Sequence, residues 1–331
     1  MEKTNNKNEA VGEMLKRMQS IIALFAIFII ATLISFKNGK NVFLDLRNIM
    51  NVLRAVSENG IIAIGMTIIL ILGDIDLSVG SVIGLISTGC AYLMVFVGLA
   101  FVPAVVISLA IGAVYGFFNG ICITKMKLQA FIVTLASMNI ARGLARFWAN
   151  GIGIPLTYGR GKGLAAIQFE YLQARMFGVI PVPAIIFITL LLIFTYVMKK
   201  TKFGRQVYAI GGNKQASYFA GINVDRVKVT AFVLCSMLAS VAAMIHAAQI
   251  SQGGPNEGQG YELNAVAACA IGGTSLAGGK GTMVGTLVGA LILGMLDNIL
   301  GLKGVNSNLQ LMVKGFIIIV AVFMQADKKK N

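Results

Sequence analysis

The sequence predicts an all-α polytopic membrane protein, and two observations support this fold class. Hydrophobic residues make up 57% of the 331-residue chain, charged residues only 12%, and mean hydropathy is +0.81. That charged share is about half of what a soluble domain carries to keep its surface hydrated. Apolar runs close to the roughly 20 residues needed to cross a bilayer recur along the chain. We therefore expect a single membrane domain over residues 20–326.

Ten apolar segments predict about ten transmembrane helices. One of them, Leu263–Ile271, is shorter than a full span and leads into a glycine cluster. No proline- or serine-rich linker divides the chain into separate domains. The other nine segments are Ser20–Phe36, Val52–Leu72, Val79–Val97, Val102–Ile123, Ala130–Ala149, Ile180–Met198, Val229–Gln249, Met283–Gly301 and Leu309–Ala326.

The distribution of basic residues predicts the orientation of these spans. The formal net charge is +15, from 28 lysines and arginines against 13 acidic residues. With the amino terminus in the cytosol and ten crossings, 17 of the 28 fall in inner segments, 8 in outer segments and three within spans. This bias follows the positive-inside rule. Segment 1–19 and the tail 327–331 are therefore expected in the cytosol, and the charge gives no reason to infer nucleic-acid binding.

The first span follows Lys16 and Arg17 but has no Ala-x-Ala-like cleavage site, so we interpret it as a retained helix. The four cysteines lie in or beside apolar runs, with no pair at metal-ligand spacing. They are expected to be buried small apolar residues rather than a disulfide framework or a metal site. These cysteines are Cys90, Cys122, Cys235 and Cys269.

Two sets of glycines at four-residue spacing indicate close helix packing. Membrane helices approach one another where small residues face the neighbouring backbone. Contact between helices of one subunit is the favoured interpretation, and a seam between two copies of the chain is the alternative. The two sets are Gly112, Gly116, Gly120 and Gly281, Gly285, Gly289.

The internal stretch Lys199–Lys228 is the most basic part of the chain and predicts a short cytosolic helix. Asn213 is a favourable N-cap and Gly221 a favourable residue just after a helix end. Tyr218 and Phe219 are too large for so short a helix to bury, so they need a receiving groove in a partner or in the membrane domain. The alternative is an amphipathic helix lying on the lipid headgroups. The residues expected in the helix are Lys214, Gln215, Ala216, Ser217, Tyr218, Phe219 and Ala220.

Asp74 and Asp76 are the only charged residues between Gly60 and Gly98. Carboxylates beside apolar spans normally face protein or water. Asp76 or Ser78 is expected to cap the helix that begins near Val79, or else to line a passage. A proton relay is disfavoured, because these two aspartates are expected to be the only plausible acidic pair near a span.

Two further features argue against chemistry carried out by this chain itself. The glycine-rich run Ile271–Thr282 is not a Walker A loop, because Thr274 and Gly281 stand where glycine and a serine or threonine are required. It is expected to be a flexible turn with no nucleotide site. His246, the only histidine, makes neither a metal site nor a triad, so it is expected to be a satisfied interior residue.

Four stretches of the sequence resemble the ribose-type permeases of bacterial ABC sugar importers, and the similarity runs from about Ile22 to Val322. One departure is Asp74, where the family pattern has a small neutral residue. The stretches are Gly73–Ser81, Lys202–Asn213, Ala220–Asn223, and Gly260–Ala268 together with Gly272–Gly281.

The resemblance implies a type II importer fold of ten helices in the bacterial inner membrane, with two permease subunits, most simply a homodimer, side by side. A cytosolic ABC ATPase then binds ATP and magnesium and docks on Lys199–Lys228, and an extracytoplasmic sugar-binding protein docks outside. The helix Lys214–Ala220 corresponds by position to the coupling helix. By this resemblance the passage candidates are Asp74, Asp76, Ser78 and Gln249.

Alternating access driven by the partner ATPase is the expected mechanism, with ribose as the first substrate to test. Galactosides, other pentoses, furanoside signals and nucleosides are carried by similar permeases. A secondary transporter or channel is the alternative class, and it requires ion-coupling groups within the membrane. An intramembrane enzyme ranks third, because no nucleophile, base and metal ligands converge in the sequence.

Overall fold

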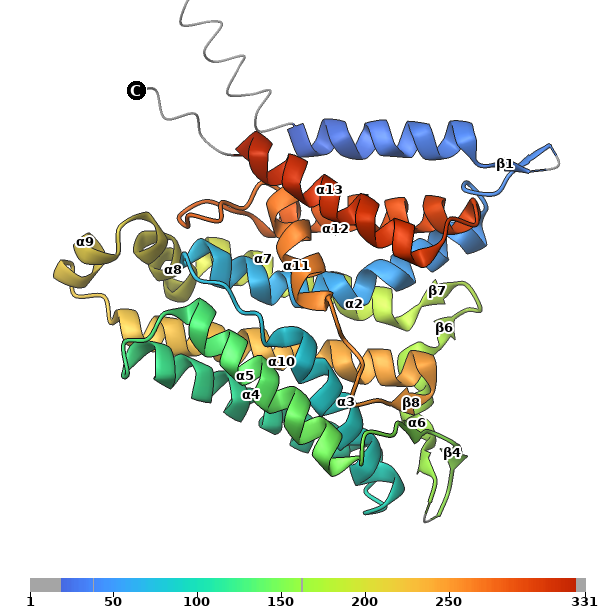
Figure 1. Ribbon diagram of the computed structural model, residues 1–331, viewed down its shortest axis with the longest axis horizontal. Coiled ribbons are helices and arrows are strands. Elements are labelled where there is room, and N and C mark those ends of the chain that lie inside the picture. The colour runs from blue at the N-terminus through green and yellow to red at the C-terminus, as the bar shows by residue number, and fades with distance from the viewer. Residues whose placement is uncertain (1–18, 38, 162, 326–331) are drawn as a thin grey trace, which may run out of the picture.

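The structure is a computed structural model that describes residues 19–37, 39–161 and 163–325 (Figure 1). The predictions for segment 1–18 and for the tail 327–331 lie outside the described residues. Most of the described chain is helical, with the long helices running side by side (Figure 1). The all-α prediction is therefore confirmed at the level of secondary structure.

Each of the ten predicted apolar segments coincides with one helix. Five of these helices, α2, α4, α7, α10 and α12, are long and apolar enough to cross a membrane. The count of ten crossings stays a prediction, because three of the others are shorter apolar helices. The helices are Gln19–Ile34, α2 (Leu46–Ile71), α3 (Val79–Val95), α4 (Phe101–Thr124), α5 (Ala130–Trp148), α7 (Val182–Lys200), α10 (Val224–Ile250), α11 (Tyr261–Ile271), α12 (Met283–Leu302) and α13 (Ser307–Gln325).

Short strands, with α6 (Ile167–Glu170) and η1 (Tyr171–Gln173), lie at the end of the molecule opposite α9 (Figure 1). The antiparallel pair β3 with β8 joins the loop after α5 to the end of α10. The other pairs are β1 with β2 and β6 with β7, both antiparallel, and the parallel pair β4 with β5. The strands are β1 (Phe36–Lys37), β2 (Lys40–Asn41), β3 (Ile154–Pro155), β4 (Tyr158–Gly159), β5 (Ala165–Ala166), β6 (Arg175–Met176), β7 (Ile180–Pro181) and β8 (Gln252–Gly253).

The same order of elements occurs twice along the chain. In the first half, α2 is followed by a non-helical segment (72–78), the short helix α3, and then α4 and α5. In the second half, α10 is followed by segment 251–260, the short helix α11, and then α12 and α13. The two halves run in opposite directions, because α2 ends beside α8 whereas α10 begins near α9 (Figure 1).

The first turns of α3 and α11 lie close together. A methyl group on Gly80 would stand 2.4 Å from the carbonyl oxygen of Gly258 and 2.0 Å from Oε2 of Glu262. Only a residue without a side chain permits so close an approach. These two segments therefore bring the starts of α3 and α11 together, which continuous spans would not do.

The core forms around α2 and α10, which pack against each other along their length (Figure 1). Residues 60–71 of α2 are buried without interruption, which fits an element surrounded by other helices. Glycine allows the closest contact: a methyl group on Gly65 would stand 2.8 Å from the Cα of Cys235. All four cysteines are free, and all but Cys122 are buried, as the sequence predicts for small apolar residues.

The two glycine sets make helix contacts within the subunit. Methyl groups on Gly112, Gly116 and Gly120 would collide with α10, at 2.3 Å from the Phe232 carbonyl oxygen in the case of Gly116. On α12, Gly285 and Gly289 face the carbonyl oxygens of Gly272 and Ala268. Gly281 differs, because it precedes α12 and lies against Thr274 and Ile71.

Candidate functional site

The end of the molecule predicted to be cytosolic has a short helix, α9 (Lys214–Phe219), with the local geometry that the sequence predicts. Oδ1 of Asn213 accepts a hydrogen bond from the Ala216 amide at 2.9 Å. Gly221 follows the helix with φ +78°, and its amide donates to the carbonyl oxygen of Tyr218. This turn needs a left-handed residue, which glycine supplies without strain.

Two aromatic side chains project from α9 without cover in the described chain. Tyr218 is 69% exposed and Phe219 is 77% exposed, and their ring centroids are 6.0 Å apart. Within α9, only Ser217 is buried. A pair of large apolar groups on so short an element is typical of a docking surface.

A second helix at this end, α8 (Lys202–Gly212), connects α9 to the core and was not predicted from the sequence. The Gly279 amide donates to the Ile71 carbonyl oxygen at 2.8 Å, and the Tyr208 hydroxyl donates to the Gly281 carbonyl oxygen at 2.8 Å. A methyl group on Gly211 would stand 1.8 Å from the same Ile71 oxygen. The end of α2, α8 and the glycine-rich turn thus form one backbone junction, defined by Ile71, Gly211 and Gly279.

The glycine-rich turn packs against the ends of α2 and α8, and the expectation that it is flexible stays a prediction. Gly278 and Gly279 are left-handed, and a methyl group on either would stand 3.1 Å from the Gly211 carbonyl oxygen, so glycine suits both positions. Burial raises the pKa of the Tyr208 hydroxyl, so this group stays protonated and donates to the turn.

Asp74 is tied to the first turns of α10. Its Oδ2 lies 2.5 Å from Nζ of Lys228, and both side chains are nearly buried. A buried carboxylate needs such a partner to remain charged. The acid that departs from the family pattern is therefore neutralised by a lysine of the same chain.

Asp76 and Ser78 lie at the start of α3 in a fully buried polar group. Oδ1 of Asp76 accepts from the Ser78 amide at 2.9 Å and from the Ser78 hydroxyl at 2.6 Å. Nδ2 of Asn119, on α4, donates to the same hydroxyl oxygen at 3.0 Å. Ser78 makes no capping hydrogen bond to α3, so its hydroxyl serves Asp76 instead of the helix.

Two oxygens of this buried group, Asp76 Oδ2 and Asn119 Oδ1, have no hydrogen-bond partner within the described part of the chain. Burial without a partner penalises the charged form of a carboxylate. One added proton on Asp76 would remove that charge and supply a donor.

Four side chains form a second, largely buried group: Glu58, His246, Glu257 and Tyr261. It is here called the outer polar cluster, because His246 lies near the end of α10 that is predicted to face outward. Nδ1 of His246 lies 2.8 Å from Oε2 of Glu58, and Nε2 lies 3.1 Å from Oε2 of Glu257. The Tyr261 hydroxyl donates to Oε2 of Glu58 at 2.9 Å. Ionised carboxylates only accept, so the geometry fits a doubly protonated imidazole ring that donates from both nitrogens. His246 is thus a satisfied interior residue, as the sequence predicts.

Two arginines of α5 hold the turn segment that carries Glu257. Nη1 of Arg142 donates to the carbonyl oxygens of Pro255 at 2.8 Å and Glu257 at 2.6 Å. Nε of Arg146 donates to Oδ1 of Asn256 at 2.8 Å. The segment between β8 and α11 is therefore fixed by charged groups of α5, and its glutamate is held against the imidazole on α10.

The acid that faces Glu257 across the imidazole is Glu58 of α2. Sequence reasoning missed Glu58, although it lies inside the predicted span Val52–Leu72. The expectation that Asp74 and Asp76 are the only plausible acidic pair near a span is therefore wrong. Glu58 is the single acidic residue in the apolar run Val52–Leu72, and this was the sequence signal that could have identified it.

The four passage candidates do not converge on one place. Asp74 pairs with Lys228 at the start of α10, and Asp76 and Ser78 lie at the start of α3. Gln249 lies at the other end of α10, where its Oε1 accepts from Nε of Arg54 at 3.0 Å. Among the described residues, no group of three or more His, Cys, Asp or Glu side chains has the arrangement of a metal site.

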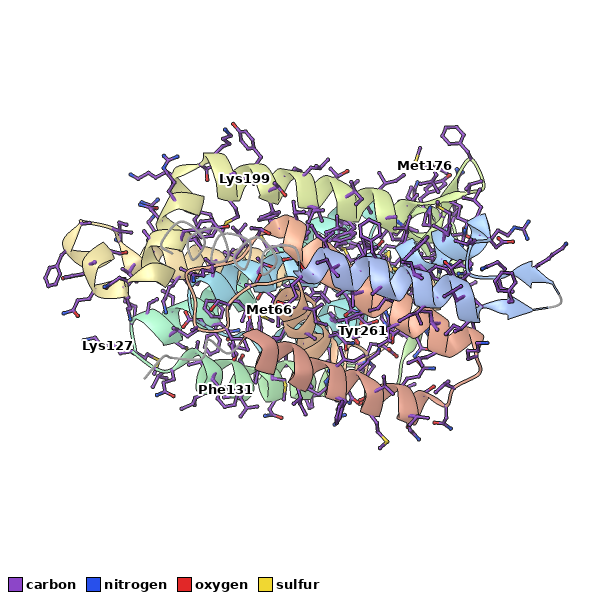
Figure 2. All side chains as sticks on the ribbon, turned by 90° about the horizontal axis from the view of Figure 1, so that it is seen from above. Met66, Lys127, Phe131, Met176, Lys199 and Tyr261 are labelled. Carbon is purple, nitrogen blue, oxygen red and sulfur yellow. The ribbon has the colours of Figure 1, made fainter. Side chains whose placement is uncertain are left out.

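Figure 2 relates these groups to the two ends of the molecule. Lys127 and Lys199 lie toward the end that carries α8 and α9, whereas Met176 lies toward the opposite end. Met66 and Tyr261 lie between them. The labelled lysines are thus on the side that the basic residues of the sequence predict to be cytosolic.

Comparison with known proteins gives a family and several relatives. Residues 48–322 match the family model described as the branched-chain amino acid transport system / permease component. The chain is 42% identical to the ribose import permease protein RbsC of Bacillus subtilis (strain 168), over 95% of this chain and 94% of the relative. It is 40% identical to RbsC of Escherichia coli (strain K12), over 96% and 95%.

A xylose transport system permease protein, XylH of Haemophilus influenzae, is 33% identical over 95% of this chain and 98% of its own length. No solved structure matches the chain. The resemblance to ribose-type permeases that the four sequence stretches indicate is confirmed by these matches.

Proposed function

Because the chain belongs to the family of permease components described for branched-chain amino acid transport systems, we propose that it is the transmembrane subunit of an ATP-driven importer for ribose or a related monosaccharide. The observation that supports this most strongly is the 42% identity to a ribose import permease over nearly the whole chain. A permease subunit of an ABC sugar importer transports and does not itself catalyse a reaction.

The proposal includes three partners. A cytosolic ABC ATPase binds ATP and magnesium, an extracytoplasmic sugar-binding protein delivers the sugar, and a second copy of this chain completes the passage. The assembly lies in the bacterial inner membrane with both termini of the chain in the cytosol. The exposed pair Tyr218 and Phe219 supports α9 as the surface on which the ATPase docks.

Transport by alternating access needs a mechanical connection between α9 and the membrane helices. The backbone junction of Ile71, Gly211 and Gly279 supplies one such connection. At this junction the backbones of α8 and the end of α2 touch directly, with no side chain between them that could move aside. The ion pair of Asp74 with Lys228 supplies another, between segment 72–78 and α10. A displacement of α9 would thus reach the two central helices directly.

Purification of the chain with its ATPase tests the partner assignment. We expect a complex with two copies of each subunit, in which ribose-loaded binding protein stimulates ATP hydrolysis. A monomeric chain that neither binds the ATPase nor changes its activity would contradict the proposal. Adding xylose-loaded binding protein as a competitor in the same assay ranks ribose and xylose, the two sugars in the names of the relatives.

A secondary transporter is the second candidate, and the outer polar cluster is the observation that favours it. An acid and a histidine buried together between apolar helices are groups that can couple transport to protons. If they did so, uptake would follow a proton gradient without ATP.

A further inference from the structure

A basic cavity lies where α10 meets α8. Its volume is about 360 Å³, and it is lined by residues of α8, of the turn after α9 and of the first turns of α10. Two of the lining side chains, Lys202 and Arg226, are basic, and none of the described lining residues is acidic. The remaining lining residues are Phe203, Gln206, Gly221, Asn223, Val227 and Thr230.

Within the described ranges, neither Lys202 nor Arg226 forms an ion pair with an acidic residue. The acids closest to the start of α10 are already paired, Asp225 with Lys125 at 3.4 Å and Asp74 with Lys228 at 2.5 Å. The cavity therefore carries positive charge that the described chain does not compensate, and it is suited to an anion.

An apolar stripe leads away from the cavity along α10. Arg226 and Thr230 are exposed, and further partly exposed residues follow on the same face at helical spacing. The other faces of α10 are largely buried. The partly exposed members are Val233, Leu234, Met237 and Val241.

The length of this stripe matches one leaflet of a bilayer. From Thr230 to Val241 the helix rises about 17 Å at 1.5 Å per residue, and half of the hydrocarbon core is about 15 Å. Beyond the stripe, η1 contacts α10 and α7, and α6 contacts α4. The stripe thus begins at a basic cavity and ends under the loop that carries α6 and η1.

We propose that this cavity and stripe bind one anionic phospholipid, with its phosphate between Lys202 and Arg226 and an acyl chain along Val233 and Met237. The leaflet is the cytosolic one, a detail that depends on the proposed orientation of the chain. Because the cavity lies between α8 and the start of α10, the bound lipid contacts the region that joins α9 to the membrane helices.

Native mass spectrometry of the purified full chain, incubated with phosphatidylglycerol or with phosphatidylcholine, tests the site. We expect one phosphatidylglycerol to be retained in preference to phosphatidylcholine. Lys202→Gln/Arg226→Gln is expected to weaken retention about 30-fold, since each basic residue near an anionic lipid contributes about fivefold. The control Lys127→Gln/Lys280→Gln removes the same charge from the same end of the molecule but outside the cavity, and retention should be unchanged.

Two further measurements separate the sources of the anion. Met237→Trp places a bulky ring on the stripe and should lower retention of the lipid, and inorganic phosphate should not displace the lipid.

Equal loss in both double variants, or displacement by phosphate alone, would overturn the proposal. Unchanged lipid retention with weaker ATPase binding in Lys202→Gln/Arg226→Gln would also overturn it, and would assign the cavity to an acidic side chain of the ATPase. None of these readouts depends on which sugar is transported.

Discussion

At the scale of single residues, substitutions in the buried polar groups are expected to have the clearest effects on stability and transport. In the outer polar cluster, one imidazole stands between two carboxylates from different elements. Removing one member of a buried ion pair leaves an uncompensated charge, whereas removing both is often tolerated. The stability of the cluster is therefore shared among its members rather than held by each side chain.

His246→Gln is expected to destabilise the protein by about 3–5 kcal/mol, because Glu58 and Glu257 lose the cation between them. Glu58→Gln/His246→Gln is expected to cost clearly less than the sum of the two single substitutions. Thermal unfolding of the purified variants checks this. Additive losses would show that the contacts are not coupled.

Asp76→Asn is expected to retain sugar uptake within about twofold, since the amide oxygen still accepts from Ser78 and the amide group adds a donor. Asp76→Ala should lower stability by about 1–3 kcal/mol, the cost of leaving buried partners unsatisfied. Uptake and thermal unfolding, measured together for both variants, distinguish an effect on transport from an effect on stability. Loss of uptake in a stable Asp76→Asn protein would mean that the carboxyl exchanges protons during transport.

At the scale of elements, α9 was predicted and α8 was missed, although Thr201 is an N-cap whose hydroxyl accepts from the Gly204 amide. Asn213 and Gly221 mark the two ends of α9. Their effect on the helix ends is local, so it can be predicted from the residue types alone. In α8, by contrast, Gly204, Gly211 and Gly212 disfavour a helix by propensity. Contact of Gly211 with the end of α2 overrides that preference, and such a contact is visible only in three dimensions.

Phe219→Asp is expected to separate ATP hydrolysis from uptake, because a carboxylate replaces the apolar group that we propose docks on the ATPase. Uptake should fall at least about tenfold while the membrane domain still folds, as one lost apolar anchor costs about 1.5–3 kcal/mol. Gln215→Asp adds the same charge to the same helix and serves as the control. Wild-type uptake by Phe219→Asp would remove α9 from the docking surface.

Gly211→Ala tests the backbone junction. The added methyl group would stand 1.8 Å from the Ile71 carbonyl oxygen, whereas at Gly212 it would meet nothing within 4 Å. Gly211→Ala should therefore impair the coupling of ATP hydrolysis to uptake, and Gly212→Ala should leave it intact. The ratio of sugar transported to ATP hydrolysed is the measurement, and equal ratios in the two variants would contradict the role of the junction.

At the scale of the whole molecule, the sequence located the helices but not their arrangement. Hydropathy finds apolar segments because each must be apolar whatever its neighbours are. It treats each segment as a continuous span, so it missed that the non-helical segments 72–78 and 251–260 bring the starts of α3 and α11 together. It also missed the outer polar cluster, whose members Glu58 and His246 are 188 residues apart in sequence.

The measurement that tests the proposed function most directly is sugar uptake into liposomes that contain the chain, its ATPase and its binding protein. We expect ribose uptake to require ATP on the ATPase side and to be unaffected by collapse of the proton gradient. Uptake driven by a proton gradient without ATP would contradict the proposal and assign Glu58 and His246 to proton coupling.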